Sequence, residues 1–126
     1  GKVIEVLAKD NKDKEILEKL VSTDEGASYL GEVALVPFDS PVNQTNLLFF
    51  NTLYDENACC HLALGRAFNE CIKDYDKLTE KEIDAVNLNK SMIHVDFMIG
   101  TNDLSIVATT YDNKEVIIFK DGLWAI

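Results

Sequence analysis

The sequence predicts an α+β fold (a mixed α/β layer structure) in which a mixed sheet with a buried helix precedes a C-terminal antiparallel meander. Apolar residues recur with helical spacing over residues 11–21. Strand-like apolar runs occupy residues 31–37 and 92–99, and two tight-turn sequences separate the last strand-like segments. Helices and strands therefore alternate in the earlier part of the chain, whereas strands alone follow at its end.

The first segments predict strand, helix, strand and loop in that order. Residues 2–8 are rich in β-branched side chains and predict a strand. Asn11 is expected to cap a helix whose first turn carries the acidic residues that suit its positive end. Residues 31–37 predict a short apolar strand with one carboxylate, Glu32, inside it, and residues 38–46 predict a loop by composition.

The middle of the chain predicts two more helices. Asp55 is expected to cap a helix over residues 56–71, which has small or apolar residues on nearly all its sides and is therefore expected to be buried. This segment carries His61, and a buried imidazole needs a polar partner. Thr79-Glu80-Lys81-Glu82 matches a capping box and predicts a short helix that ends near residues 87–90.

Residues 92–99 are the most strand-like stretch of the sequence. His94 and Asp96 are two positions apart, so both side chains project from the same face of the expected strand. The opposite face, which we expect to belong to the core, carries Ile93, Val95, Phe97 and Ile99.

The C-terminal residues predict an antiparallel meander. Residues 104–111 and 115–120 are expected to pair across a tight turn, and Asp121-Gly122 offers a second hairpin turn before residues 123–126. The sequence has no internal repeat or linker, and 126 residues are enough to bury a core without disulfides. We therefore expect a single domain over residues 1–126.

Composition narrows the possible partners. A net charge of -10 argues against nucleic acid, whose phosphates an acidic protein repels. No apolar run approaches the roughly 20 residues that cross a membrane, so we expect no membrane partner. Three cysteines without a C-x-x-C spacing favour buried, reduced thiols and a cytoplasmic location.

Two histidines and three carboxylates in largely apolar segments suggest a metal site, although each also has a structural interpretation. His94 and Asp96 can form an internal hydrogen-bonded pair, and His61 can be a core histidine with a polar partner. Glu32 can lie on an edge strand, and Glu56 can simply favour the positive end of a helix. Together the five residues form a ligand set for zinc, cobalt or manganese, and bridging carboxylates also allow two ions.

Four parts of the sequence carry a resemblance to the M29 family of metallo-aminopeptidases. They are Gly31-Glu32-Val33-Ala34-Leu35-Val36, the pattern N-T-L-x-D-E-N-A-x-x-H-L-A-L-G over residues 51–65, His94-Val95-Asp96-Phe97-Met98-Ile99-Gly100 and the closing Gly122-Leu123-Trp124. The resemblance runs in order along the whole chain. It covers only about the last third of a family member, so residues 1–126 are expected to be a C-terminal metal-binding domain without the family's N-terminal part.

The resemblance implies an activity and a role for each candidate residue. It implies a metal-dependent aminopeptidase that releases N-terminal residues from peptide substrates with water activated at a site of two divalent ions. Glu32 would be the catalytic carboxylate shared between the ions, and Glu56, His61, His94 and Asp96 would be the other ligands. Family members are expected to be cytoplasmic homodimers.

Two departures from the family pattern affect these expectations. The family uses a further glutamate well upstream of Glu32, and no matching segment is present in this sequence, so the 126 residues alone are expected to be inactive. Phe68 also stands where the family usually has a tyrosine. The alternative functions are a non-catalytic structural and dimerisation domain or, less favoured, an enzyme that uses one of the three thiols.

Overall fold

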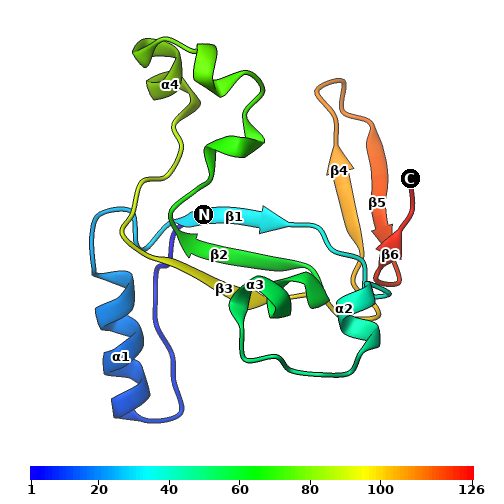
Figure 1. Cartoon of the computed structure of the whole chain (residues 1–126), viewed down its shortest axis with the longest axis horizontal. Coiled ribbons are helices and arrows are strands. Elements are labelled where there is room, and N and C mark those ends of the chain that lie inside the picture. The colour runs from blue at the N-terminus through cyan, green and yellow to red at the C-terminus, as the bar shows by residue number, and fades with distance from the viewer. The chain divides into compact units, whose positions relative to one another are not determined.

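The computed structural model describes all 126 residues, which divide into two compact units (Figure 1). The first unit comprises residues 1–33 and 62–95, and the second comprises residues 34–61 and 96–126. Each unit is therefore built from two separate stretches of the chain. None of the helices combines the length and the apolarity that a membrane span requires.

Between Asn11 and Met98, most helical and strand residues belong to two helices and one three-stranded sheet. These elements are α1 (Asn11–Val21), β1 (Leu30–Ala34), β2 (His61–Gly65), α4 (Glu80–Val86) and β3 (His94–Met98). The strands lie in the order β1-β2-β3, so β2 is the central strand. Two short 3-10 helices, Asn69–Cys71 and Tyr75–Lys77, precede α4.

Backbone hydrogen bonds show that β2 runs antiparallel to β3. At one end the Arg66 N–H donates to the Ile93 carbonyl at 2.7 Å, and at the other the Ile99 N–H donates to the Cys60 carbonyl at 3.0 Å. Higher residue numbers on one strand therefore face lower numbers on the other. The arrows of β1 and β2 also point in opposite directions in Figure 1.

The predicted helix over residues 56–71 is wrong, because its middle forms the central strand β2. His61, Ala63 and Gly65 are buried while the two leucines between them are half-buried, which is the two-residue period of a strand. A strand with neighbours on both sides needs apolar residues along its whole length, so its sequence resembles that of a buried helix. Gly65 has φ of 95°, a conformation that favours glycine, at the end of this strand.

The outer segments of the first unit agree only partly with the sequence. The predicted strand over residues 2–8 is wrong, since only Lys2 makes an isolated bridge, with Tyr29. The first helix is confirmed, but Asp10 caps it instead of Asn11, accepting a hydrogen bond from the Asp13 N–H at 2.9 Å. The capping box of α4 is present as predicted, because Thr79 and Glu82 bond each other's backbone N–H groups.

The second unit begins with two short helices where we expected a loop and a helix cap. They are α2 (Pro41–Gln44) and α3 (Thr52–Asp55), and a 3-10 helix over Glu56–Ala58 follows. Ser40 is buried, caps α2 and donates from its hydroxyl to the Asn57 carbonyl at 2.8 Å. This bond fixes α2 to the residues that lead into β2.

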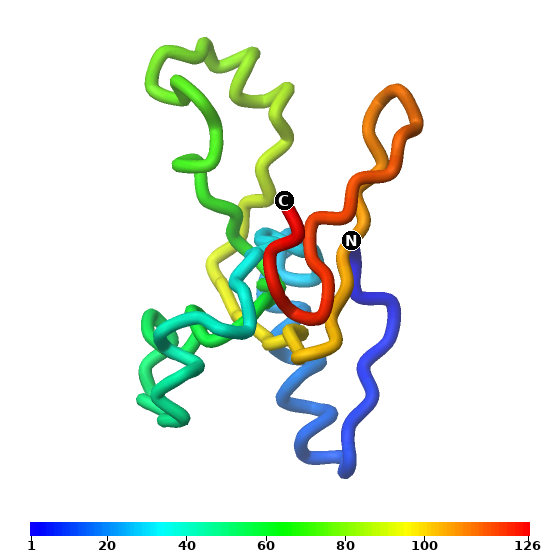
Figure 2. Tube along the Cα trace, turned by 90° about the vertical axis from the view of Figure 1, so that its right-hand side faces the viewer, coloured from blue at the N-terminus to red at the C-terminus, as the bar shows by residue number.

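The C-terminal meander is confirmed in its strand order β4-β5-β6. Its strands are β4 (Ile106–Thr109), β5 (Glu115–Lys120) and β6 (Leu123–Trp124), and Figure 2 shows the β4–β5 hairpin from the side. Asp121 and Gly122 have φ of 52° and 72°, as a primed hairpin turn requires. Phe119 is fully buried and packs against Trp124, with ring centroids 4.4 Å apart.

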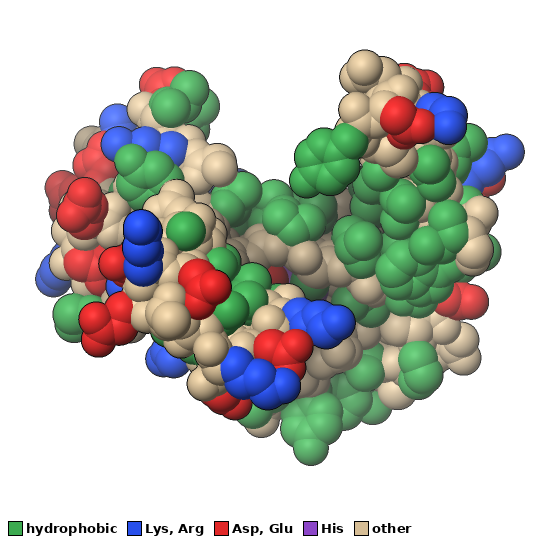
Figure 3. Space-filling model, turned by 90° about the horizontal axis from the view of Figure 1, so that it is seen from above, with side chains coloured by type: hydrophobic (Ala, Val, Ile, Leu, Met, Phe, Trp, Pro, Cys, Tyr) green, Lys and Arg blue, Asp and Glu red, His purple; other side chains and the backbone are tan.

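The buried apolar core is small. It consists of Ala27, Cys59, Cys60, Ala63 and Phe119. The expectation that one face of residues 92–99 is core is wrong, because Val95, Phe97 and Ile99 are 36%, 41% and 39% exposed. Cys71 is exposed, so the expectation of buried thiols is correct for only two of the three cysteines. Apolar side chains are accordingly common on the surface seen in Figure 3.

Candidate metal centre

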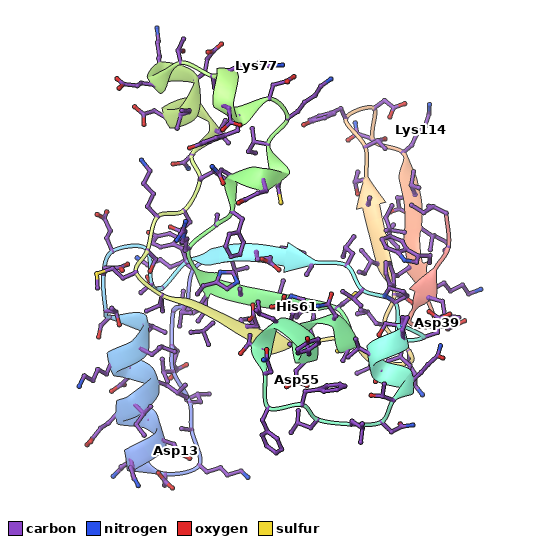
Figure 4. The ribbon with its side chains drawn as sticks, viewed as in Figure 1. Asp13, Asp39, Asp55, His61, Lys77 and Lys114 are labelled. Atoms are coloured by element: carbon purple, nitrogen blue, oxygen red, sulfur yellow. The ribbon has the colours of Figure 1, made fainter.

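Three of the predicted ligands come together within the second unit. Glu56 from the 3-10 helix, His61 from the start of β2 and Asp96 from β3 each offer one ligand atom, and these atoms all lie within 4.8 Å of one another. His61 is 3% exposed, and both carboxylate oxygens of Asp96 are buried. Figure 4 labels His61 on β2. The sequence alone placed Glu56 and His61 on one predicted helix and Asp96 on a strand far from it along the chain.

The local backbone fixes the tautomer of His61. Its Nδ1 lies 3.1 Å from the Cys59 carbonyl oxygen, which can only accept a hydrogen bond. Nδ1 therefore carries the proton, and in the neutral imidazole the lone pair is on Nε2. A metal-binding histidine in proteins usually donates from its other ring nitrogen in this way.

The other two predicted ligands, Glu32 and His94, form a pair within the first unit. The Glu32 Oε2 lies 3.6 Å from the His94 Nε2, and the side chains are 27% and 20% exposed. His94 Nδ1 lies 2.7 Å from the Arg66 carbonyl oxygen, so this nitrogen is also the donor. The Phe68 ring lies against the His94 ring, with centroids 4.7 Å apart and planes at 55°.

The donor set of Glu56, His61 and Asp96 suits a divalent transition metal. Ligand atoms bound at about 2.0–2.2 Å to one ion lie at most roughly 4.4 Å apart, close to the 4.8 Å limit within which these three atoms fall. One imidazole nitrogen with carboxylate oxygens is a combination that zinc, cobalt and manganese accept. The residues therefore fit a metal ion.

Comparison with known proteins identifies the family. Residues 1–124 match the family model described as thermophilic metalloprotease (M29). The chain belongs to the M29 metalloprotease family. The resemblance noted in the sequence is thus confirmed.

Several M29 relatives are closely similar over the whole of this chain. Aminopeptidase AmpS of Bacillus subtilis (strain 168) is 49% identical and aminopeptidase 2 of Geobacillus stearothermophilus 50% identical, each over 125 residues. The structure of wild-type AmpT from Thermus thermophilus is 39% identical and superimposes with a TM-score of 0.80, which confirms the α+β fold. This chain is covered at 99% or more in each comparison but spans only 30% of the length of each relative.

The cysteines beside the candidate ligands have a structural role. Burial raises the pKa of the Cys59 thiol, so this group stays protonated at neutral pH and is a poor metal ligand. The Cys60 thiol donates to the Val36 carbonyl and accepts from the Val36 N–H, both at 3.3 Å. Cys59 and Cys60 therefore stabilise the backbone that leads into His61.

The sequence did not identify Asp24 as the residue that fixes the backbone just before His94. The Asp24 carboxylate accepts hydrogen bonds from the Met92 N–H at 2.6 Å and the Ser91 hydroxyl at 3.0 Å. The Met92 N–H, followed by the other donors, holds the pKa of this carboxyl below its ordinary value. These bonds fix the chain two residues before β3 begins. Because Asp24 and Met92 are 68 positions apart, no local pattern predicts the contact.

Proposed function

We propose that the protein acts as a metal-dependent aminopeptidase that releases N-terminal residues from peptides. The observation that carries this proposal is the cluster of Glu56, His61 and Asp96, whose ligand atoms lie within 4.8 Å of one another. Membership of a metalloprotease family, and relatives named as aminopeptidases, support the same conclusion. The activity is that of the longer M29 enzymes, of which this chain spans 30%.

From the family resemblance we propose that all five predicted residues are ligands of two divalent ions, zinc, cobalt or manganese. His94 and Asp96 are two residues apart on β3, which places both side chains on one face of that strand. Glu32, beside His94 in the first unit, would be the carboxylate ligand common to the two ions. Bound metal would supply Lewis acidity toward the peptide carbonyl and lower the pKa of a water molecule.

The residues of this chain orient the ligands and move protons. The Cys59 and Arg66 carbonyls hold both imidazoles with the proton on Nδ1 and the lone pair on Nε2. A carboxylate of the site would take a proton from the attacking water and pass it to the leaving amine. The substrates we propose are short peptides with apolar or mixed N-terminal residues.

Calorimetric titration with zinc, cobalt and manganese tests the metal site. We expect the wild type to bind and Glu56→Gln to bind at least about tenfold more weakly, because a neutral amide is a poor ligand. Glu70→Gln is the matched control, since Glu70 is exposed and outside the cluster. Absence of binding by the wild type would overturn the proposed site.

We further propose that these 126 residues alone do not turn over peptides. The family's upstream glutamate has no counterpart within the sequence, so one ligand of the implied set is missing. Leucyl-peptide hydrolysis by this chain and by a full-length M29 relative, measured side by side with each metal, tests this. Robust cleavage by the 126 residues would contradict it.

The second candidate function is a non-catalytic structural and dimerisation domain. Its supporting observation is the exposed apolar face of the C-terminal sheet, where Val107, Ile117 and Trp124 are 52%, 50% and 46% exposed. Surfaces of this kind are often covered by another protein surface. Light scattering of the wild type and of Ile117→Lys distinguishes a dimer that uses this sheet from a monomer. A dimer without metal binding would favour this function, and a cytoplasmic location stays a prediction for either.

A further inference from the structure

The backbone and ring that follow β2 restrain His94 in two different ways. The Arg66 carbonyl oxygen accepts a hydrogen bond from His94 Nδ1 at 2.7 Å. The Phe68 ring lies against the imidazole with a centroid distance of 4.7 Å and an angle of 55° between the planes. All three residues belong to the first unit. The remaining ring nitrogen, Nε2, is the one that faces Glu32, at 3.6 Å.

The first restraint sets which nitrogen carries the proton. The Arg66 carbonyl is itself fixed, because the Arg66 N–H donates to the Ile93 carbonyl at 2.7 Å, beside the β3 ligand. A carbonyl oxygen cannot donate, so the hydrogen bond holds the proton on Nδ1 and the lone pair on Nε2. A hydrogen bond to a single ring atom still permits the imidazole to tilt about that atom.

The second restraint limits this tilt. A centroid distance of 4.7 Å falls within the 4.5–7 Å range in which aromatic rings attract each other beyond simple area burial. Phe68 is 40% exposed, so its ring covers His94 from the outside and is not part of the core. A ring in this position restrains the plane of the imidazole.

We propose that Phe68 is a positioning residue for His94, fixing the imidazole plane so that Nε2 is directed to the metal. The inference rests on the proposed function, in which His94 is a ligand. The effect depends on the aromatic face and needs no hydroxyl, so it should persist in Phe68→Tyr and be lost in Phe68→Leu. Phenylalanine at a position where the family usually has tyrosine therefore still supports the ligand.

Metal affinity is the first test. Titration with zinc should show Phe68→Leu binding about tenfold more weakly than the wild type, in the range typical for residues that orient a ligand, and Phe68→Tyr binding within about twofold of it. Phe50→Leu is the matched control, because Phe50 is 89% exposed and belongs to neither ligand set. Equal affinities for Phe68→Leu and the wild type would overturn the proposal.

Nuclear magnetic resonance of the metal-free protein gives a second readout that a purely stabilising residue would not change. Long-range ¹H–¹⁵N spectra should assign the Nδ1–H tautomer to His94 in the wild type and both Phe68 variants. The order parameter of the imidazole C–H bonds should fall in Phe68→Leu and stay at the wild-type value in Phe68→Tyr and Phe50→Leu. Unchanged imidazole order in Phe68→Leu, or an Nε2–H tautomer in the wild type, would overturn the proposal.

The two tests separate this inference from the function on which it rests. If the wild type binds no metal, the ligand role of His94 fails together with the proposed function. If the wild type binds metal but Phe68→Leu binds equally well, only the role of Phe68 fails. Backbone amide spectra of each variant show whether it is folded, and Phe68→Tyr provides the rescue if Phe68→Leu is not.

Discussion

The two histidines of this protein make the same kind of hydrogen bond to a backbone carbonyl in very different surroundings. Each imidazole donates from Nδ1 to a backbone carbonyl, that of Cys59 for His61 and that of Arg66 for His94. His61 is 3% exposed on the central strand, whereas the His94 side chain is 20% exposed and covered by Phe68. One histidine is therefore part of the core, while the other depends on local contacts and is partly exposed. Substitutions should separate these two cases.

The largest effect is expected for His61→Ala. Removing a buried side chain leaves a cavity beside the central strand, which should cost about 2 kcal/mol of unfolding free energy. Metal affinity should fall by more than the roughly 10–100-fold that is typical when only an orienting partner is lost. Urea unfolding with a chelator present measures the first effect, and calorimetric titration measures the second. An unchanged unfolding free energy would show that His61 is not a core residue.

His94→Ala should lower metal affinity with a smaller effect on the metal-free fold than His61→Ala has. The imidazole is partly exposed but donates to the Arg66 carbonyl, so the unfolding free energy should fall by about 1 kcal/mol. The same urea and titration experiments apply, with His61→Ala as the reference. If both variants lose equal stability without metal, the distinction between a core ligand and a surface ligand is wrong.

Features of the fold that depend on neighbouring residues were predictable from the sequence. Thr79 and Glu82 form the capping box that their spacing predicts. The Asp121-Gly122 turn likewise has the positive φ values that its residue types favour. Such features are specified by contacts only a few residues apart.

The errors concern segments whose structure is decided by distant parts of the chain. Residues 61–65 form a strand because residues 29 and 93, remote in sequence, supply its neighbours. The spacing of His94 and Asp96 predicts that both lie on one face of a strand, but no spacing brings Asp96 to His61 and Glu56. The candidate ligands were nevertheless identifiable, because charged and imidazole groups in apolar segments need partners wherever the segments fold.

A smaller effect on stability is expected at acid pH from Asp24, whose carboxylate fixes the backbone just before His94. The Met92 N–H and further donors lower the pKa of Asp24 from its usual 3.8 in the folded protein. A depressed folded-state pKa means that this stabilisation is fully present above about pH 4 and is lost as the pH falls through the lowered value. At pH 7, Asp24→Asn should therefore have a lower unfolding free energy than the wild type. As the pH falls, it should lose less unfolding free energy than the wild type loses.

Thermal unfolding of both proteins between pH 7 and pH 2 checks this expectation. Glu82 and Asp112 also have lowered pKa values, from hydrogen bonds to Thr79 and Lys114 respectively, so part of the acid sensitivity should remain in Asp24→Asn. Glu82→Gln is the matched control, since it removes a comparable group from α4 and leaves the Met92 contact intact. Identical pH profiles for wild type and Asp24→Asn would refute the role of Asp24.

The mildest test leaves the wild-type sequence unchanged and uses its thiols as reporters of the His61 region. Cys71 is exposed and should be alkylated first, whereas Cys59 and Cys60 are buried and the pKa of the Cys59 thiol is raised by burial. At pH 8 mass spectrometry should therefore show one rapid adduct and two slow ones.

Because the Cys59 carbonyl holds His61, alkylation of the slow thiols measures how often this region opens. A loss of about 2 kcal/mol in His61→Ala corresponds to roughly 30-fold faster labelling, since about 1.4 kcal/mol is a factor of ten. In His94→Ala the slow rate should rise less than in His61→Ala, because the His94 imidazole is partly exposed. Equal acceleration in both variants would mean that the two imidazoles are supported by a single cooperative structure and not by two separate ones.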